Sequence, residues 1–156
     1  MVRASSAAAD MLDPQKIRFV DVDGVRTRYY EDGAGEPLVL FHGGHFGEWY
    51  SLDCWSLNLA DLAKHFHVYA VDKLGQGHTD NPKSDADYTF EALFRHALGF
   101  VQAIGITEAH FLGHSRGALL VAMFAFYNPE LVKTLIIVDS NTLAPDSPIF
   151  PGRRFY

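Results

Sequence analysis

The stretch Leu112-Gly113-His114-Ser115-Arg116-Gly117 decides the fold of this chain of 156 residues. It has the pattern Gly-x-Ser-x-Gly, in which a serine occupies a strained turn between a strand and a helix. The two glycines are needed because the incoming strand and the outgoing helix approach too closely for a Cβ atom. Such a turn exposes the serine hydroxyl, so Ser115 is the candidate nucleophile of this sequence.

The residues on either side of this motif have the composition that such a turn requires. Residues 109–112 form a short apolar run typical of a strand, and residues 118–127 are apolar on every side and end at Asn128-Pro129. All-round apolarity over that length predicts a helix buried in a globular core. The alternative is a serine that only caps a helix after a glycine-rich turn. That alternative explains the hydroxyl but not both glycines.

Continuous apolar runs elsewhere in the chain predict parallel strands that are covered on both faces. These runs are residues 38–41, 68–71, 111–112 and 135–138. Apolar residues at helical spacing lie between them, over residues 52–66 and 90–104. Asp87 or Thr89 can cap the second of these helices, and Gly105 ends it.

Residues 17–30 alternate apolar and polar side chains around Asp23-Gly24, a dipeptide that suits a tight hairpin turn. An antiparallel hairpin followed by alternating strands and helices predicts an α/β fold, with a mostly parallel sheet and helices on both faces. We expect an N-terminal tail over residues 1–16 and one domain over residues 17–156.

Composition and charge restrict the partners of the chain. Hydrophobic residues make up 48% of it, which excludes general disorder. Thirteen basic and nineteen acidic residues give a net charge of −6, so we expect no nucleic-acid or membrane partner. No apolar run approaches the ~20 residues that span a bilayer. The single cysteine, Cys54, excludes an internal disulfide, and together these features predict a cytoplasmic protein.

Three motifs together resemble the α/β-hydrolase fold superfamily, in the order in which that superfamily has them. They are His42-Gly43-Gly44, the loop over residues 72–79, and the Gly-x-Ser-x-Gly turn, which is the nucleophile elbow of the superfamily. The resemblance covers roughly residues 17–144. It implies that Ser115 is the nucleophile and that the backbone N–H groups of Gly44 and Arg116 form an oxyanion hole.

The same resemblance assigns the loop over residues 72–79 an architectural role, with Asp72 as a structural residue and Gly75 and Gly77 as turn formers. It implies no cofactor. We also expect no metal site, because the histidines do not have the spacing of metal ligands. The Arg116 side chain replaces the Met or Gln that the superfamily often has at this position.

Within the superfamily, residues 137–145 and the His42-Gly43-Gly44 loop resemble hydrolases that cleave carbon–carbon bonds in meta-cleavage products of aromatic compounds. This resemblance implies a small-molecule substrate, either an ester or a C–C bonded ketone. Carboxylesterases, lactonases and epoxide hydrolases have similar sequences in this region. Epoxide hydrolases normally use an aspartate nucleophile, however, where this chain has Ser115.

A serine nucleophile needs a general base and an acidic group that orients the base. All eight histidines precede Ser115, whereas the superfamily has its histidine late in the chain. We therefore expect the chain to end before the substrate-covering cap and the C-terminal half of a complete hydrolase. His45 is a candidate base or an ordinary loop histidine. Asp139 is a candidate acid or a turn former, and the more usual place for the acid is one strand later.

Two functions of different class follow from these features. In the first, the chain is the N-terminal portion of a serine hydrolase whose activity needs the remaining half. In the second, it is a non-catalytic binding or interaction module that kept the half-sheet. The motifs favour the first, because a pure binder has no evident use for them. We also expect self-association through the exposed sheet edge, where the last strand presents apolar side chains.

Overall fold

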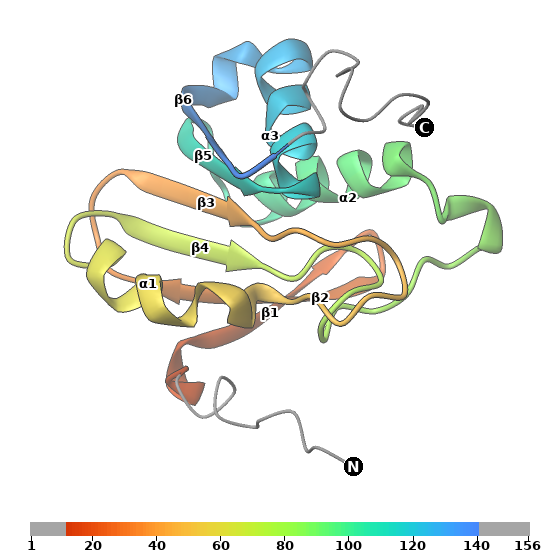
Figure 1. Cartoon of the computed structure of the whole chain (residues 1–156), viewed down its shortest axis with the longest axis horizontal. Helices are drawn as coiled ribbons and strands as arrows, with labels where there is room; N and C mark the ends of the chain where they lie inside the picture. The colour runs from red at the N-terminus through yellow and green to blue at the C-terminus, as the bar shows by residue number, and fades with distance from the viewer. Residues whose placement is uncertain (1–11, 141–156) are drawn as a thin grey trace.

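The computed structural model describes residues 12–140, which form one six-stranded sheet with helices against both of its faces (Figure 1). The strands are β1 (Ile17–Val22), β2 (Val25–Asp32), β3 (Pro37–Phe41), β4 (His67–Val71), β5 (Ala109–His114) and β6 (Val132–Val138). The α-helices are α1 (Ser56–Leu62), α2 (Phe90–Ala103) and α3 (Arg116–Tyr127). Short 3-10 helices are η2 (Pro14–Lys16), η3 (Leu52–Trp55), η4 (Asp85–Asp87) and η5 (Pro129–Leu131).

The strand order in the sheet is β1-β2-β4-β3-β5-β6. Strands β1 and β2 form the predicted antiparallel hairpin, β2 also pairs antiparallel with β4, and the other neighbours are parallel. At the hairpin turn, Asp23 and Gly24 have φ angles of 51° and 78°, which a tight primed turn requires. The predicted fold class, with its mostly parallel sheet and N-terminal hairpin, is confirmed.

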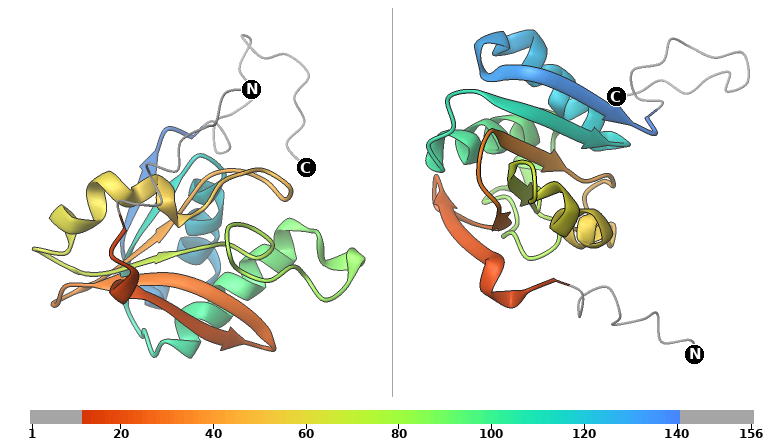
Figure 2. Two further views of the ribbon diagram at one scale, coloured as in Figure 1. Left: turned by 90° about the horizontal axis from the view of Figure 1, so that it is seen from below. Right: turned by 90° about the vertical axis from the view of Figure 1, so that its left-hand side faces the viewer.

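The two faces of the sheet are packed by alternate residues of the same strands. Val39 and Phe41 of β3 belong to the core cluster that includes side chains of α2 and α3. Leu38 and Leu40 belong to the cluster on the other face, with Trp55 of η3 and side chains of α1. Figure 2 shows these helices on opposite sides of the sheet. The apolar run over residues 38–41 is continuous because both of its faces are covered.

Two predictions about burial are wrong for the described residues. Helix α3 is not buried on every side, since Phe126 and Tyr127 are 77% and 61% exposed. The apolar run over residues 135–138 of β6 is not covered on both faces, since these residues are 38–44% exposed. The place of β6 at the exposed edge of the sheet is as expected. The physical reason is the same in both cases. The described residues cover only part of each element, since α3 packs against the sheet and α2 on one side and β6 pairs with β5 along one edge.

The predicted tail lies only partly within the described residues, which exclude residues 1–11. Leu12 is buried in the core cluster beside α1, and Asp13 caps η2. Lys16 forms an ion pair with Asp32, with 2.6 Å between Nζ and Oδ2. The division of the chain at residue 17 remains a prediction.

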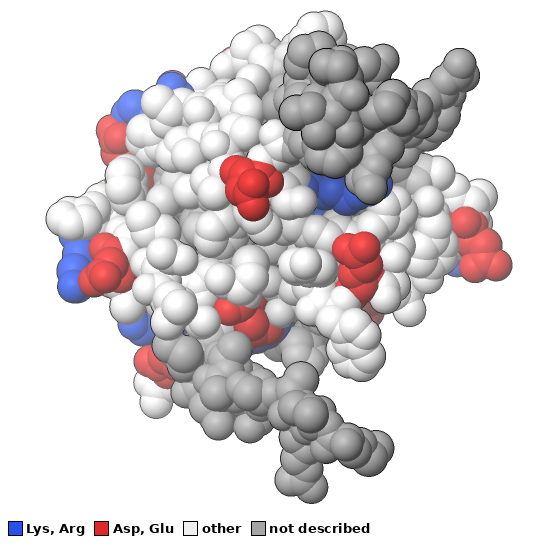
Figure 3. All heavy atoms as spheres, viewed as in Figure 1, with Lys and Arg blue, Asp and Glu red and all other residues white. Residues whose placement is uncertain are grey.

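No helix in residues 12–140 has the length and apolar character to cross a membrane. On the face drawn in Figure 3, acidic and basic side chains are scattered among uncharged ones.

Candidate active site

Ser115 lies in the turn between β5 and α3, the strand–turn–helix context that the motif predicts. Its backbone has φ 52° and ψ −117°, a conformation that a residue with a Cβ atom rarely adopts. The Ser115 N–H donates to the Val138 carbonyl at 3.0 Å, and its own carbonyl accepts from the Ala118 N–H at 3.0 Å. The Ser140 hydroxyl donates to the same Ser115 carbonyl at 2.7 Å. These contacts hold the strained turn in place.

Both glycines of the elbow (residues 113–117) lie where a side chain would not fit. A Cβ at Gly113 would be 2.3 Å from the Gly117 carbonyl oxygen, and a Cβ at Gly117 would be 2.3 Å from the Phe41 carbonyl oxygen. The Ser115 side chain makes no capping hydrogen bond to α3, so the helix-cap alternative does not hold. The predicted need for both glycines is confirmed.

The loop over residues 42–44 packs directly against the elbow. A Cβ at Gly43 would be 3.0 Å from the Ser115 Cβ, and Gly44 has a φ of 80°. Arg116 is the first residue of α3. In the turns, caps and loops of residues 12–140, neither the Gly44 N–H nor the Arg116 N–H donates a hydrogen bond. The structure therefore places Gly43, which precedes the predicted donor Gly44, against Ser115, which precedes the predicted donor Arg116.

The ring of His42 orients the 42–44 loop. Burial lowers the pKa of His42 to about 3, so the ring is neutral at pH 7. Its Nε2 accepts the Lys73 N–H at 3.2 Å, so Nδ1 carries the proton and donates to the Gly43 carbonyl at 2.8 Å. That carbonyl and the Gly44 N–H belong to one planar peptide group. His42 thus restrains the direction of the Gly44 N–H.

This role of His42 was not predicted from the sequence. The signal for it is the position of a histidine directly after the buried run of β3, since an imidazole that enters a core needs partners on both nitrogens. Nothing in the sequence indicates which atoms those partners are.

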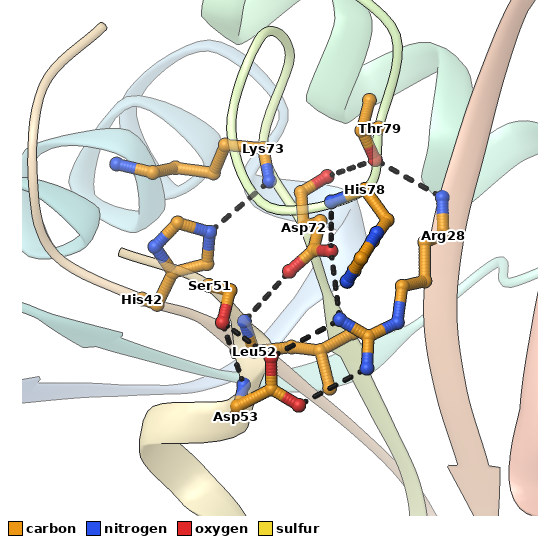
Figure 4. Close-up of polar contacts among 9 residues, drawn as sticks. All are labelled: Arg28, His42, Ser51, Leu52, Asp53, Asp72, Lys73, His78 and Thr79. Atoms are coloured by element: carbon orange, nitrogen blue, oxygen red, sulfur yellow. Dashed lines mark hydrogen bonds and ion pairs between the residues drawn. The ribbon is translucent and has the colours of Figure 1, made fainter. Parts of the chain in front are cut away.

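Asp72 is the centre of a buried polar cluster that joins three segments of the chain (Figure 4). Its Oδ1 accepts the Leu52 N–H at 2.7 Å, and its Oδ2 accepts the His78 N–H at 2.8 Å and Arg28 Nη1 at 3.2 Å. A Cβ at Gly77 would be 2.2 Å from Asp72 Oδ2. The predicted structural role of Asp72 and the turn-forming role of Gly77 are confirmed.

The two other candidate residues, Asp139 and His45, directly follow β6 and the 42–44 loop. Asp139 follows β6 with a φ of 45°, its side chain is 93% exposed, and its Oδ2 is 4.0 Å from His114 Nε2. The His45 N–H donates to Glu48 Oε2 at 2.7 Å, and its ring packs edge-on against Phe46. The roles of Asp139 as acid and of His45 as base therefore stay predictions.

Two hollows lie beside these elements. One, of about 580 Å³, is bordered by Trp55, Leu112 and Val138, and the other, of about 450 Å³, is bordered by residues 47–51 and 75–78. In the part of the chain that the structure describes, no group of three or more His, Cys, Asp or Glu side chains is placed to hold a metal ion.

Comparison with known proteins places the chain in a family. Residues 36–155, which are most of the chain, match the family model of the alpha/beta hydrolase fold. The chain belongs to the alpha/beta hydrolase fold family.

Its relatives include hydrolases of meta-cleavage products, as the sequence predicts. The 2-hydroxy-6-oxo-6-(2'-aminophenyl)hexa-2,4-dienoic acid hydrolase of Metapseudomonas resinovorans is 36% identical, over 79% of this chain and 42% of that protein. A variant of the meta-cleavage product hydrolase from Pseudomonas fluorescens IP01 has a TM-score of 0.68 and 31% identity, over 76% of this chain and 43% of that one.

A third relative is named as a phospholipase and not as a hydrolase of meta-cleavage products. A bacterial membrane phospholipase A has a TM-score of 0.76 and 30% identity, over 84% of this chain and 41% of that one. The chain thus spans less than half the length of each of these relatives.

Proposed function

We propose that this chain carries the nucleophile and the oxyanion donors of a serine hydrolase. The observation that carries the proposal is the conformation of Ser115, a positive-φ residue held between β5 and α3 against the 42–44 loop. Backbone strain of this kind persists only where the surroundings impose it, and it is concentrated at functional sites. Ser115 is only partly buried, so a substrate can reach its side chain.

In the proposed reaction, a general base takes the proton of the Ser115 hydroxyl as its oxygen attacks a carbonyl carbon, and negative charge develops on the carbonyl oxygen. His45 is the candidate base among these residues, whereas the superfamily usually has its histidine late in the chain. The N–H groups of Gly44 and Arg116 are the proposed donors to that oxygen. The loss of one such donor typically raises the barrier by ~3 kcal/mol. The N-terminus of α3 adds a favourable field at the same place, because helix dipoles stabilise nearby negative charge. We assign Asp139 as the candidate acid of this site.

The proposed substrate is a small molecule with an ester or a C–C bonded ketone group. The names of the relatives support both, since one is a dienoic acid hydrolase and another a phospholipase A. We further propose that residues 17–156 are the N-terminal portion of the hydrolase domain. A cytoplasmic location, without nucleic-acid or membrane partners, is the proposal most consistent with the net charge of −6 and the single cysteine.

The second candidate function is a non-catalytic binding module. The exposed apolar strand β6 favours it, because residues 135–138 form a surface to which a partner can bind. A binding module does not require a strained serine, however, so the first proposal accounts for more of the structure.

A burst experiment with p-nitrophenyl acetate separates the two functions. The chain, Ser115→Ala and the control Ser84→Ala, which changes an exposed serine at the cap of η4, are mixed with the ester. An acyl-enzyme gives a rapid release of up to one equivalent of p-nitrophenolate per chain, followed by slow turnover. We expect this release to be slow in the chain and in Ser84→Ala, because the superfamily's usual histidine base lies late in the chain, and to be absent in Ser115→Ala. Equal release from all three proteins would refute the nucleophile and favour the binding module.

A further inference from the structure

Lys73 is a buried lysine whose side chain contacts the candidate oxyanion loop. The residue is only 4% exposed, and its Nζ donates to the Gly44 carbonyl at 2.8 Å. Lysine is almost never buried to this extent without a counter-charge. Among the described residues, no carboxylate lies within ion-pair distance of this Nζ. Burial of a charged group without an ionic partner is unfavourable, so the contact with Gly44 needs an explanation.

The segment that begins at Lys73 holds the 42–45 region at three points. The Lys73 N–H donates to His42 Nε2, the Lys73 ammonium donates to the Gly44 carbonyl, and Gln76 Nε2 donates to the His45 carbonyl at 2.8 Å. Two successive carbonyl groups are thus held by side-chain donors from one neighbouring loop. Such an arrangement restrains backbone orientation more strongly than a single contact does.

Gly44 needs restraint of this kind. It lies in the left-handed region with a φ of 80°, and glycine has more backbone freedom than any other residue. Its N–H is the proposed oxyanion donor, and an oxyanion donor acts only when it is held in its orientation before the reaction.

We propose that Lys73 is a positioning residue. Its protonated ammonium holds Gly44 in the conformation that presents the Gly44 N–H to the oxyanion. The protonation of Lys73 therefore controls how firmly this donor is held. This inference rests on the proposed function. It goes beyond that function because it makes the strength of the oxyanion site depend on pH.

The titratable groups that face the Lys73 ammonium come from three elements. Burial and the guanidinium of Arg116 on α3 lower the pKa of Lys73 to about 7, while the carboxylate of Glu48 in the loop after β3 acts in the opposite direction. Burial raises the pKa of the Cys54 thiol on η3 to about 12, so this thiol is uncharged near pH 7. Below about pH 7 the ammonium form holds the Gly44 carbonyl with a charge-assisted hydrogen bond. Above that pH the neutral amine is a weaker donor, so the restraint on Gly44 relaxes.

The first test follows the Gly44 amide by two-dimensional ¹H–¹⁵N NMR between pH 5.5 and 8.5, in the chain and in Lys73→Met. We expect the Gly44 signal to shift with a midpoint near pH 7 in the chain and to lose that titration in Lys73→Met. The control Lys83→Met removes an exposed lysine that donates to the Asp23 carbonyl, and it should retain the titration. A Gly44 signal that does not titrate in the chain overturns the proposal without any variant having to fold.

The second test measures the rate at which a fluorophosphonate labels Ser115 in the chain and in Lys73→Met. At each pH, the rate in the chain is divided by the rate in Lys73→Met. We expect a ratio of about tenfold at pH 6 that falls towards one above pH 8. Lys73→Arg should keep the tenfold advantage to pH 8.5, because a guanidinium stays protonated. A merely structural lysine would give a ratio that does not change with pH, and this result would overturn the proposal.

The two tests separate this inference from the function on which it rests. If Ser115 is not labelled in any protein, the proposed hydrolase function fails, whereas the Gly44 titration still reports on Lys73. If Ser115 is labelled but neither the Gly44 signal nor the rate ratio depends on pH, only the role of Lys73 fails.

Discussion

Gly117 of α3 lies against the carbonyl group of Phe41, the last residue of β3, so closely that a Cβ at position 117 would be 2.3 Å from the Phe41 oxygen. The carbonyl of His42 lies 2.7 Å from the same position. The start of the elbow helix and the start of the candidate oxyanion loop are therefore packed backbone against backbone. The geometry of the site depends on this contact.

Gly117→Ala should push the elbow away from β3. We expect the substitution to lower the free energy of unfolding by about 1–3 kcal/mol, because one extra carbon in a closely packed place forces the backbone to shift. Urea unfolding followed by circular dichroism measures this. The control Ala125→Ser adds one atom at a half-exposed position of the same helix and should change the free energy by less than ~0.5 kcal/mol. Equal effects of the two substitutions would contradict the close packing.

Asp72→Ala should remove the centre of the polar cluster beside η3. The substitution leaves the Leu52 and His78 N–H groups without their carboxylate and removes one of the two partners of buried Arg28. We expect a loss of about 3–5 kcal/mol of unfolding free energy, the usual cost of breaking a buried ion pair. Asp61→Ala removes an exposed carboxylate that pairs with Lys64, and it should leave the urea midpoint unchanged. A small effect of Asp72→Ala would show that the cluster is not structural.

His96 should make the stability of the fold depend on pH in the acidic range. Burial lowers its pKa to about 4, and its Nε2 lies 2.9 Å from Thr27 Oγ1. In the unfolded chain an imidazole has a pKa of about 6.5. Between these values the unfolded chain binds a proton that the folded chain does not, so the unfolding free energy falls as the pH falls from about 6.5 to about 4.

The urea midpoint measured at intervals between pH 7 and pH 4 tests this prediction. His96→Gln should make the decline shallower, by about 1–3 kcal/mol over the range. The decline should not vanish, since His42 is also buried and neutral. His65→Gln, at an exposed position, should leave the slope unchanged. The same slope in His96→Gln as in the unmodified chain would contradict the assignment.

The exposed edge strand β6 should make the chain self-associate. Ile137 is 44% exposed on this strand, and edge strands with apolar side chains pair readily with other chains. We expect the average mass measured by light scattering to rise with concentration, and Ile137→Lys to suppress the rise. Leu57→Lys changes a leucine of α1 that is 74% exposed, away from the sheet edge, and should have no effect. A mass that equals that of one chain at every concentration would contradict the prediction.

The sequence predicted the elements of the fold well because each has a local signal. Asp23-Gly24 indicated the hairpin, and the apolar runs indicated the parallel strands. The prediction that β6 is covered on both faces and α3 on every side was wrong, since an apolar run does not reveal whether a neighbouring element covers it. The place of β6 at an exposed sheet edge was predicted correctly. Phe126 illustrates this, because its place in an all-apolar helix resembles that of the buried Phe124.

The candidate site was predicted in part. The elbow glycines had a stereochemical reason that a short motif expresses, and the structure places them as that reason requires. The contacts of His42 and Lys73 were not predictable, because they join residues about thirty positions apart through a loop whose path the sequence does not specify. Long-range contacts of single side chains depend on the packed structure as a whole.

The most direct test of the central claim is the chemical reactivity of Ser115. The chain, Ser115→Ala and Ser84→Ala are incubated with a fluorophosphonate, and the modified residue is identified by tandem mass spectrometry. We expect one label per chain, located on Ser115, in the unmodified chain and in Ser84→Ala, with none in Ser115→Ala. Labelling spread over several serines, or equal labelling of Ser115→Ala, would contradict the claim that the elbow presents an accessible, nucleophilic hydroxyl beside two backbone donors.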